Sequence, residues 1–204
     1  MVKVYNDFSN RSELIQFPQK GEGTMQVENE LKLLLSDKEY NMLMQSLLPI
    51  MTKRVQQTNY YYDTKDELMR KDNVTVRIRQ KGTQLNGTLK RHLDKSGYST
   101  EEHFSVDMLP VAIMLDGVPV WLKGALVTNR AVFRICEGIM LMLDCNSYLD
   151  IMDYELEVEF TDGLRSQAEG ILTFIRSLLH HEHITESITK SERFFRRLNQ
   201  ANPS

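Results

Sequence analysis

The sequence predicts an α+β protein in which short antiparallel strands close into a barrel. Several segments alternate between apolar and polar residues, and they follow one another closely with only a few helical segments between them. In most of these segments the polar side is charged. Together these observations predict a barrel with one apolar and one charged surface.

The first strand is predicted at residues 27–35. Side chains alternate across a strand, so the apolar residues share one face. The other face carries Glu28, Glu30 and Lys32. Taken alone, this face is most simply the solvated side of a one-sided sheet. The same arrangement recurs along the chain with other charges, and this recurrence favours a functional surface.

Two capping boxes mark where helices begin. Ser36 with Glu39 begins a helix after the first strand, and Thr189 with Glu192 begins a short C-terminal helix. Pro49 ends the first of these helices. Apolar residues at helical spacing predict another amphipathic helix over residues 166–180.

Further strands are predicted between these helices, at residues 56–64, 74–80, 87–91, 98–106, 127–134, 139–144 and 153–160. Residues 81–86 and 146–147 are expected to form turns. The alternation stops over residues 110–126, and residues 111–115 have the apolar spacing of a short helix.

Charged residues gather on one face of the predicted strands. The acids are Glu28, Glu30, Glu101, Asp144, Glu155 and Glu157, with Glu159 as a further candidate. The bases are Lys32, Arg77, Arg79, Lys90 and Arg130. The apolar stripes of the helices need an apolar sheet surface to cover, which places the apolar faces outside the barrel and the charges inside.

A charged interior of mixed sign suits an anionic ligand that is bridged by cations. Arginines bind phosphate oxygens through paired hydrogen bonds. Clustered carboxylates bind Mg²⁺ or Mn²⁺, because these cations prefer oxygen ligands. Without such partners the buried charges would be too costly.

These residues resemble a known family. Glu28-x-Glu30-x-Lys32 is similar to the N-terminal ExExK signature of the CYTH superfamily, the triphosphate tunnel metalloenzymes, which include class IV adenylyl cyclases, thiamine triphosphatases and inorganic tripolyphosphatases. The resemblance extends from Met25 to Leu198 through an ordered set of motifs: Arg77-x-Arg79, Thr88-Leu89-Lys90, Glu101, Arg130, Asp144, Glu155-x-Glu157 and Lys190-Ser191. It is closest to small CYTH-domain proteins of Gram-positive bacteria, through Tyr60-Tyr61-Tyr62-Asp63-Thr64 and Asp153-Tyr154-Glu155-Leu156-Glu157.

The resemblance implies an eight-stranded antiparallel tunnel, wrapped by helices, that binds a small-molecule triphosphate with Mg²⁺ or Mn²⁺. It implies metal-binding roles for Glu28, Glu30, Glu101, Asp144, Glu155 and Glu157. It implies phosphate-binding roles for Lys32, Arg77, Arg79, Lys90, Arg130 and Lys190.

The expected catalytic residues are Glu28, Glu30 and Lys32. Lys32 would orient or deprotonate water, and deprotonation needs a lowered pKa that the neighbouring acids oppose. Two positions depart from the family's pattern, His103 and Thr128, and both bear on the choice of substrate.

We expect divalent-metal-dependent hydrolysis of inorganic tripolyphosphate, thiamine triphosphate or a nucleoside triphosphate. An adenylyl cyclase would bind the triphosphate in the same way but release cyclic AMP and pyrophosphate. A non-enzymatic sensor of polyphosphate or nucleotide would leave its ligand intact. The sequence shows no dedicated adenine pocket, which favours hydrolysis among the three.

Length and composition fit one domain, at residues 25–200. We expect a monomer or a homodimer. The net charge of −3 over 204 residues gives no support for nucleic-acid binding. No apolar run is long enough to cross a bilayer, and two cysteines alone suit a reducing, cytoplasmic environment. Residues 1–24 are predicted to be a leader outside the domain, with Met25 as the true start, because their periodicity is weak and the codons of Lys20-Gly21-Glu22 can contain a ribosome-binding sequence.

Overall fold

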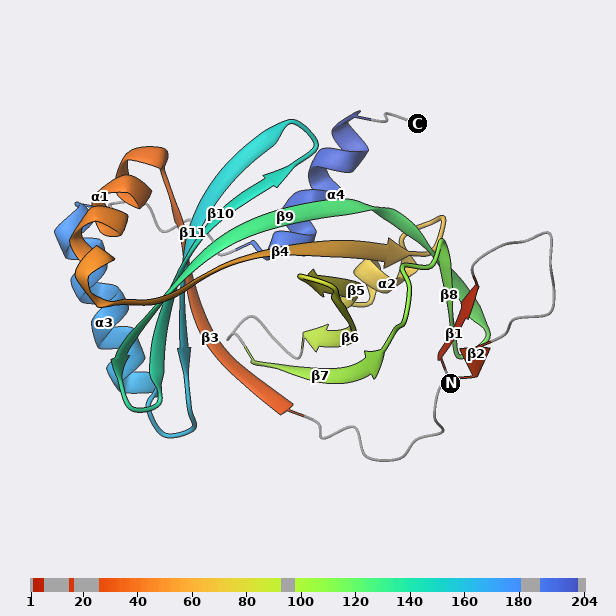
Figure 1. The fold of residues 1–204 in the computed structure, drawn as a ribbon, viewed down its shortest axis with the longest axis horizontal. Coiled ribbons are helices and arrows are strands. Elements are labelled where there is room, and N and C mark those ends of the chain that lie inside the picture. The colour runs from red at the N-terminus through yellow and green to blue at the C-terminus, as the bar shows by residue number, and fades with distance from the viewer. Residues whose placement is uncertain (1, 6–14, 17–25, 93–97, 181–187, 202–204) are drawn as a thin grey trace. The chain divides into compact units, whose positions relative to one another are not determined.

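The computed structural model describes residues 2–5, 15–16, 26–92, 98–180 and 188–201 (Figure 1). The chain forms two compact units, each made from segments that are distant in the sequence. Unit 1 contains Met1–Val27, Thr58–Lys95 and Ser99–Leu126, and unit 2 contains Glu28–Gln57, Ser96–Tyr98 and Val127–Ser204. Among the described residues, no helix is long and apolar enough to cross a membrane.

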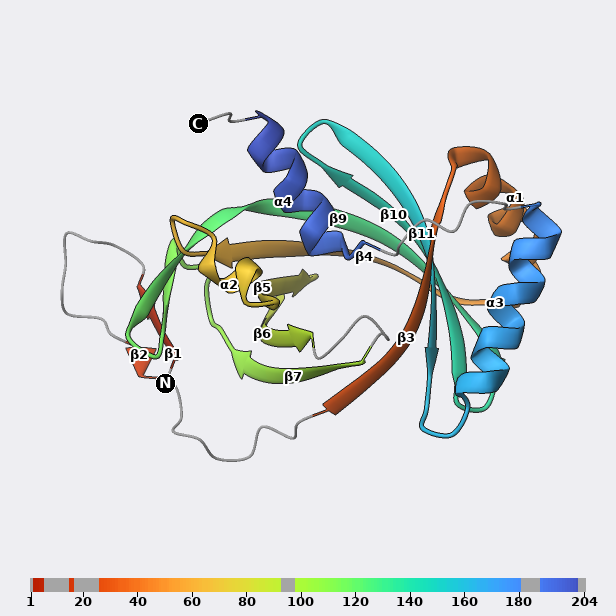
Figure 2. The ribbon, with the colours of Figure 1, turned by 180° about the vertical axis from the view of Figure 1, so that it is seen from behind.

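Unit 2 is built on four antiparallel strands in the order β9, β10, β11 and β3. These strands are β9 (Val118–Cys136, which enters this unit at residue 127), β10 (Ile139–Tyr148), β11 (Ile151–Phe160) and β3 (Gln26–Leu35). Their residues alternate as predicted, so the sheet has one apolar and one polar face. Two helices, α1 (Asp37–Leu47) and α3 (Arg165–Leu179), lie next to each other over the apolar face in both views (Figures 1 and 2).

The apolar core of unit 2 forms between the sheet and these two helices. Leu33 of the sheet belongs to one buried cluster with Leu43 of α1 and Ile175 of α3. The predicted capping box at the start of α1 is confirmed, since the Ser36 amide donates to Glu39 Oε2 at 2.7 Å and the Glu39 amide donates to Ser36 Oγ at 3.3 Å. Helices therefore cover the apolar face of this sheet, as the sequence predicts.

The remaining elements of unit 2 are a 3₁₀ turn, the first part of β4 and the C-terminal helix. A 3₁₀ turn, η1 (Leu48–Ile50), follows α1, and β4 (Met51–Asp63) then runs from unit 2 into unit 1. The C-terminal helix α4 (Lys190–Ala201) lies on the other side of the sheet from α1 and α3 (Figure 2). Its buried residues Phe194 and Phe195 anchor it there. The centroids of the Phe194 ring and the Tyr148 ring on β10 are 6.2 Å apart.

Unit 1 contains further antiparallel strands, in the order β4, β5, β6 and β7. These are β5 (Val74–Lys81), β6 (Gln84–His92) and β7 (Tyr98–Ser105), and a short helix, α2 (Leu68–Lys71), joins β4 to β5. The apolar side chains of these strands, such as Ile78 and Val76, pack in one cluster with Ile113 of β8 (Ala112–Leu115) and Val120 of β9. A β-hairpin thus contributes to the core here, where helices were predicted.

Three local predictions were wrong. The turn expected at residues 81–86 is confined to residues 82 and 83, because β5 continues to Lys81 and β6 begins at Gln84. Residues 111–115 are not a helix, because Asp116 and Gly117 form a two-residue turn, with φ of 48° and 85°, that pairs β8 with β9. Residues 146–147 continue β10, and the chain turns instead at Leu149 and Asp150, with φ of 44° and 63°. The turn at Leu149 and Asp150 contains no glycine, so it was hard to predict from the sequence.

Part of the N-terminal segment also forms strands. β1 (Val2–Tyr5) pairs antiparallel with β8 and with β2 (Ile15–Gln16). The interpretation of residues 1–24 as a leader stays a prediction. The predicted α+β class with antiparallel strands is confirmed.

The packing of unit 1 leaves no room for a side chain at Gly87. Gly87 lies in β6 directly opposite Phe104 of β7, and a Cβ at this position would lie 2.0 Å from the Phe104 ring. We therefore expect Gly87→Ala to lower the free energy of unfolding by about 1–3 kcal/mol, because the ring must move. Denaturant unfolding of the two proteins measures this difference.

The matched control is Gly170→Ala in α3. A Cβ there meets nothing within 4 Å, and alanine favours a helix over glycine by up to about 1 kcal/mol. This variant should be more stable than the parent. A Gly87→Ala protein as stable as the parent would show that the Phe104 ring is not held over Gly87.

Candidate functional site

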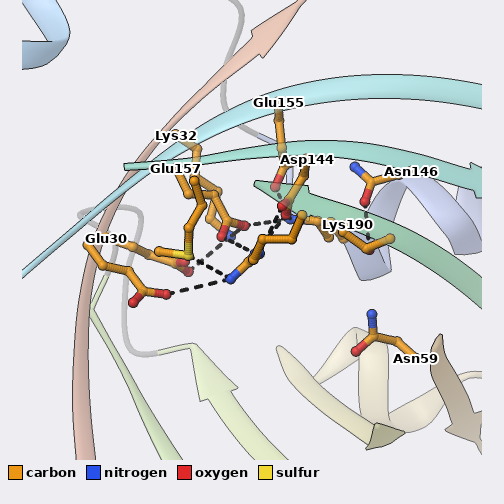
Figure 3. A network of polar contacts seen from close by, with 12 residues as sticks. Glu30, Lys32, Asn59, Asp144, Asn146, Glu155, Glu157 and Lys190 are labelled. Atoms are coloured by element: carbon orange, nitrogen blue, oxygen red, sulfur yellow. Dashed lines mark hydrogen bonds and ion pairs between the residues drawn. The ribbon is translucent and has the colours of Figure 1, made fainter. Parts of the chain in front are cut away.

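The polar face of unit 2 brings together charged side chains from all four strands of its sheet (Figure 3). The register places Arg130 opposite Asp144, which in turn lies opposite Glu155. Glu157, two residues along β11, lies opposite Lys32. Directly opposed residues share a face of a sheet. We call this group the acidic cluster; with the helix residues described below, it comprises Glu30, Lys32, Arg130, Asp144, Asp153, Glu155, Glu157, Glu159, Lys190 and Arg193.

Arg130 binds two of the acids at once. Its Nε and Nη2 donate to Asp144 Oδ1 and Oδ2 at 2.8 and 2.6 Å, and Nη2 also reaches Glu157 Oε2 at 2.5 Å. The first two bonds form the paired geometry that makes arginine–carboxylate contacts strong. Asp144 is 0% exposed, so its charge would be very costly without such a partner. The arginine therefore holds both acids in place.

A second cation reaches the same acids from α4. Lys190 places Nζ 2.8 Å from Asp144 Oδ2 and 2.5 Å from Glu157 Oε1, and it also contacts Glu155 Oε1. The helix begins at this lysine because the Thr189 hydroxyl accepts a hydrogen bond from a backbone amide of the first turn at 3.2 Å. The predicted cap thus positions the lysine against three carboxylates.

Arg193, one helical turn after Lys190, binds further acids. It donates to Asp153 Oδ2 at 2.8 Å and to Glu155 Oε2 at 2.5 Å. Asp153 also accepts from Asn146 Nδ2 at 2.9 Å, so the network continues along the sheet. Arg193 and Asn146 were not among the site residues predicted from the sequence. Arg193 lies three residues after Lys190, and this spacing puts the two cations on one side of a helix. That spacing could have indicated Arg193 as a site residue.

Lys32 lies beside Glu30 at the edge of the acidic cluster. Its Nζ is 2.9 Å from Glu30 Oε1 and 3.7 Å from Glu157 Oε1. Burial alone would lower the pKa of Lys32, but these carboxylates raise it above its ordinary value. This shift is opposite to the one a general base needs. The structure therefore gives no support to water deprotonation by Lys32, and its charge suits the orientation or binding of an anion.

The two central glutamates of β11 respond differently to their burial. For Glu157, burial opposes ionisation, but the surrounding cations, Arg130 above all, hold its pKa well below the usual range. For Glu155, burial is the largest effect and raises its pKa, although Lys190 opposes the shift. Glu157 is therefore the more firmly ionised of the two.

The acids are close enough together to hold a metal ion. Asp144, Glu155 and Glu157 each place one carboxylate oxygen within 4.8 Å of the others. Glu30 and Glu159 do the same with Glu157. Mg²⁺ and Mn²⁺ prefer oxygen donors of this kind, so the residues fit the predicted metal by donor type and by spacing.

Unit 1 carries a second group, in which cations predominate. Arg77 Nη2 and Lys90 Nζ lie 3.3 and 3.4 Å from Glu101 Oε1, and His103 Nε2 lies 3.6 Å from Glu101 Oε2. Burial would raise the pKa of Glu101, but the arginine and the lysine lower it. Arg79 Nε donates to Asn59 Oδ1 at 2.9 Å. We call this group the basic cluster; it comprises Asn59, Arg77, Arg79, Lys90, Glu101 and His103.

The predicted site residues thus fall into two groups, one in each unit. Glu101 lies among cations, and it belongs to no group of three candidate metal-binding side chains among the described residues. Its predicted role as a metal ligand is therefore the least supported of the set. Glu28 lies in β3, but its side chain is outside those that the structure describes. Thr128, one of the two departures from the family's pattern, donates to Asn146 Oδ1 at 2.8 Å.

The arrangement belongs to a known class of proteins. Residues 26–194 match the model of the CYTH domain. The match covers most of the chain, so this protein belongs to the CYTH domain family, as the resemblance of its motifs implied.

Individual relatives are named for reactions of triphosphates. "Putative triphosphatase YjbK" of Bacillus subtilis (strain 168) is 28% identical over 153 residues, which cover 68% of this chain and 80% of that protein. A crystal structure described as a putative adenylate cyclase from Bacillus halodurans is 26% identical, covers 85% of this chain and 100% of that one, and has a TM-score of 0.68. The structure of Hippeastrum HpAC1 is described as a putative adenylyl cyclase with a dominant triphosphatase activity. It is 21% identical, covers 83% of this chain and 95% of that one, and has a TM-score of 0.65. At this identity the likeness supports the shared fold and nothing more. The predicted fold class is confirmed by these likenesses.

The contacts of Lys190 predict that it compensates the charge of the buried acids. Methionine in its place would keep the length of the side chain but leave three buried carboxylates without the cation they share. We expect Lys190→Met to lower the free energy of unfolding by about 3 kcal/mol in the absence of added metal. Denaturant unfolding in a chelator measures this loss.

The control on the same helix is Arg196→Met. Arg196 is exposed and its Nε lies 2.8 Å from Glu192 Oε1; such surface pairs contribute about 0.5 kcal/mol or less. Equally small losses in both variants would show that Lys190 does not compensate the buried acids.

Proposed function

We propose that this protein hydrolyses small-molecule triphosphates and that it needs a divalent metal, Mg²⁺ or Mn²⁺, to do so. The observation that carries the proposal is the acidic cluster, whose buried carboxylates lie close enough together to hold a metal ion. The acidic cluster has more carboxylates than cations, whereas the basic cluster sets Arg77, Arg79 and Lys90 against one carboxylate. The first composition suits a divalent metal ion, and the second suits phosphate oxygens. The relative named as a triphosphatase supports this substrate class.

The metal would be held by Asp144, Glu155 and Glu157, with Glu28 and Glu30 as further ligands. A bound divalent ion supplies charge neutralisation at phosphate oxygens and makes water a better nucleophile at neutral pH. Glu157 suits this role because it is the more firmly ionised of the two central glutamates.

The cations of the chain would bind the phosphate oxygens. Arg77, Arg79 and Lys90 supply fixed donors from neighbouring strands. Such donors stabilise the negative charge that develops on the leaving oxygen as the terminal P–O bond breaks. Arg130 and Lys190 contact the acids directly, and with Lys32 they are the further phosphate ligands that we propose.

Adenylyl cyclase activity is the second candidate, because the Bacillus halodurans relative is described as a putative adenylate cyclase. The same cations would bind the triphosphate of ATP, but the ribose hydroxyl would attack the α-phosphorus. A third reading is binding without reaction. The nature of the product separates these three activities.

The decisive experiment is a screen of metals against substrates. Tripolyphosphate, thiamine triphosphate and ATP are each incubated with Mg²⁺, Mn²⁺ or excess chelator, and the products are analysed. We expect orthophosphate, released only with metal. Cyclic AMP with pyrophosphate would establish the cyclase instead, and intact ligand under all conditions would exclude both enzymes. Undiminished hydrolysis in chelator would exclude the metal.

Arg79 generates a prediction about substrate binding. Its guanidinium lies on the polar face of β5 and is held by Asn59. A hydrogen bond to a charged group contributes about 1.5–3 kcal/mol, so Arg79→Ala should weaken the binding of tripolyphosphate by roughly tenfold or more. Isothermal titration calorimetry measures the affinity.

Arg91→Ala is the matched control. Arg91 is exposed and pairs in register with Val74, on the other face of the same sheet. Its removal takes away the same charge without removing a proposed ligand. Equal affinities for the parent and Arg79→Ala would show that Arg79 does not bind phosphate.

A further inference from the structure

Asn59 has a buried hydrogen-bond donor that nothing in the described part of the chain satisfies. The residue is 1% exposed, and its Oδ1 accepts from Arg79 Nε at 2.9 Å. A guanidinium can only donate, so the amide must present its oxygen to Arg79. This fixes the orientation of the amide, and Nδ2 is left without an acceptor among the described residues. Buried groups in this condition are rare in native proteins and call for an explanation.

A second unsatisfied donor lies close by on the same sheet face. Arg77 Nε is also buried and has no acceptor among the described residues. Asn59 lies opposite Arg79 in the β4–β5 register, and Arg77 is two residues along β5 on the same side. Both orphan groups are N–H donors. A partner that satisfies them must therefore offer acceptor atoms, as a phosphate does and a metal ion does not.

We propose that Asn59 is a further substrate-binding residue, whose Nδ2 donates to an oxygen of the phosphate chain that Arg77 and Arg79 bind. This inference rests on the proposed function, since it assigns one more contact to the same substrate. It gives Asn59 two tasks. Oδ1 orients the Arg79 guanidinium before the substrate arrives, and Nδ2 adds a directional contact without adding charge.

Substitutions of Asn59 separate the two tasks. Asn59→Leu has nearly the same shape but neither the donor nor the acceptor. Asn59→Asp keeps an acceptor for Arg79, so the pair and the fold are retained, but it replaces the donor with a second acceptor that repels phosphate. The control is Asn86→Asp. Asn86 is exposed and lies opposite Arg79 from the other neighbouring strand, so it brings the same charge to the same arginine without touching the buried donor.

The test is the affinity for tripolyphosphate, measured by calorimetry in excess chelator, so that metal does not contribute. We expect Asn59→Leu to bind roughly tenfold more weakly than the parent. Asn59→Asp should bind more weakly still, and clearly more weakly than Asn86→Asp. Thermal unfolding of each variant shows whether it is folded.

Each outcome has a distinct meaning. If Asn59→Leu binds as tightly as the parent, Nδ2 does not contact the ligand and the inference is overturned. If Asn59→Leu fails to fold, the two aspartate variants decide, and equal affinities of Asn59→Asp and Asn86→Asp overturn it. A parent protein that binds no tripolyphosphate, with or without metal, would instead remove the proposed function itself.

Discussion

The structure of the charged face in unit 2 depends on one constraint, the burial of Asp144, Glu155 and Glu157 at adjacent positions. Three carboxylates so close together repel one another, and burial removes the water that would otherwise screen them. Arg130 and Lys190 compensate these negative charges by contacting the acids directly. Arg130 lies opposite Asp144 on β9, and Lys190 is the first residue of α4, so both cations are placed where they compensate these charges.

The alternation of the strands could be predicted because a strand has a period of two residues and cannot place neighbours on one face. Glu30 with Lys32, Arg77 with Arg79, and Glu155 with Glu157 were assigned to shared faces on that basis, and the registers agree. The capping box at Ser36 is equally local, since its partners are three residues apart. For such features the spacing in the sequence is already the spacing in the structure.

Features that depend on contacts between distant segments could not be predicted in this way. Strand β8 exists because it pairs with β9 and β1, and its apolar spacing alone was also compatible with a helix. Asn59 acquires its importance from lying opposite Arg79, a register that the tyrosine-rich sequence of β4 does not reveal. The division of the predicted charges into an acidic and a basic cluster likewise became visible only when the strand neighbours were known.

The turn at Leu149 and Asp150 has a consequence for the order in which the protein is made. It joins β10 directly to β11, so the chain that carries Asp144, Glu155 and Glu157 is complete when residue 160 leaves the ribosome. Lys190 and Arg193 belong to the last helix and are synthesised later. A nascent chain therefore holds its acids before it holds two of their cations. Until α4 is made, Arg130 can already compensate Asp144 and Glu157, but Glu155 lacks both of the described cations that contact it. The burial of Glu155 with a compensated charge therefore waits for the last helix of the chain.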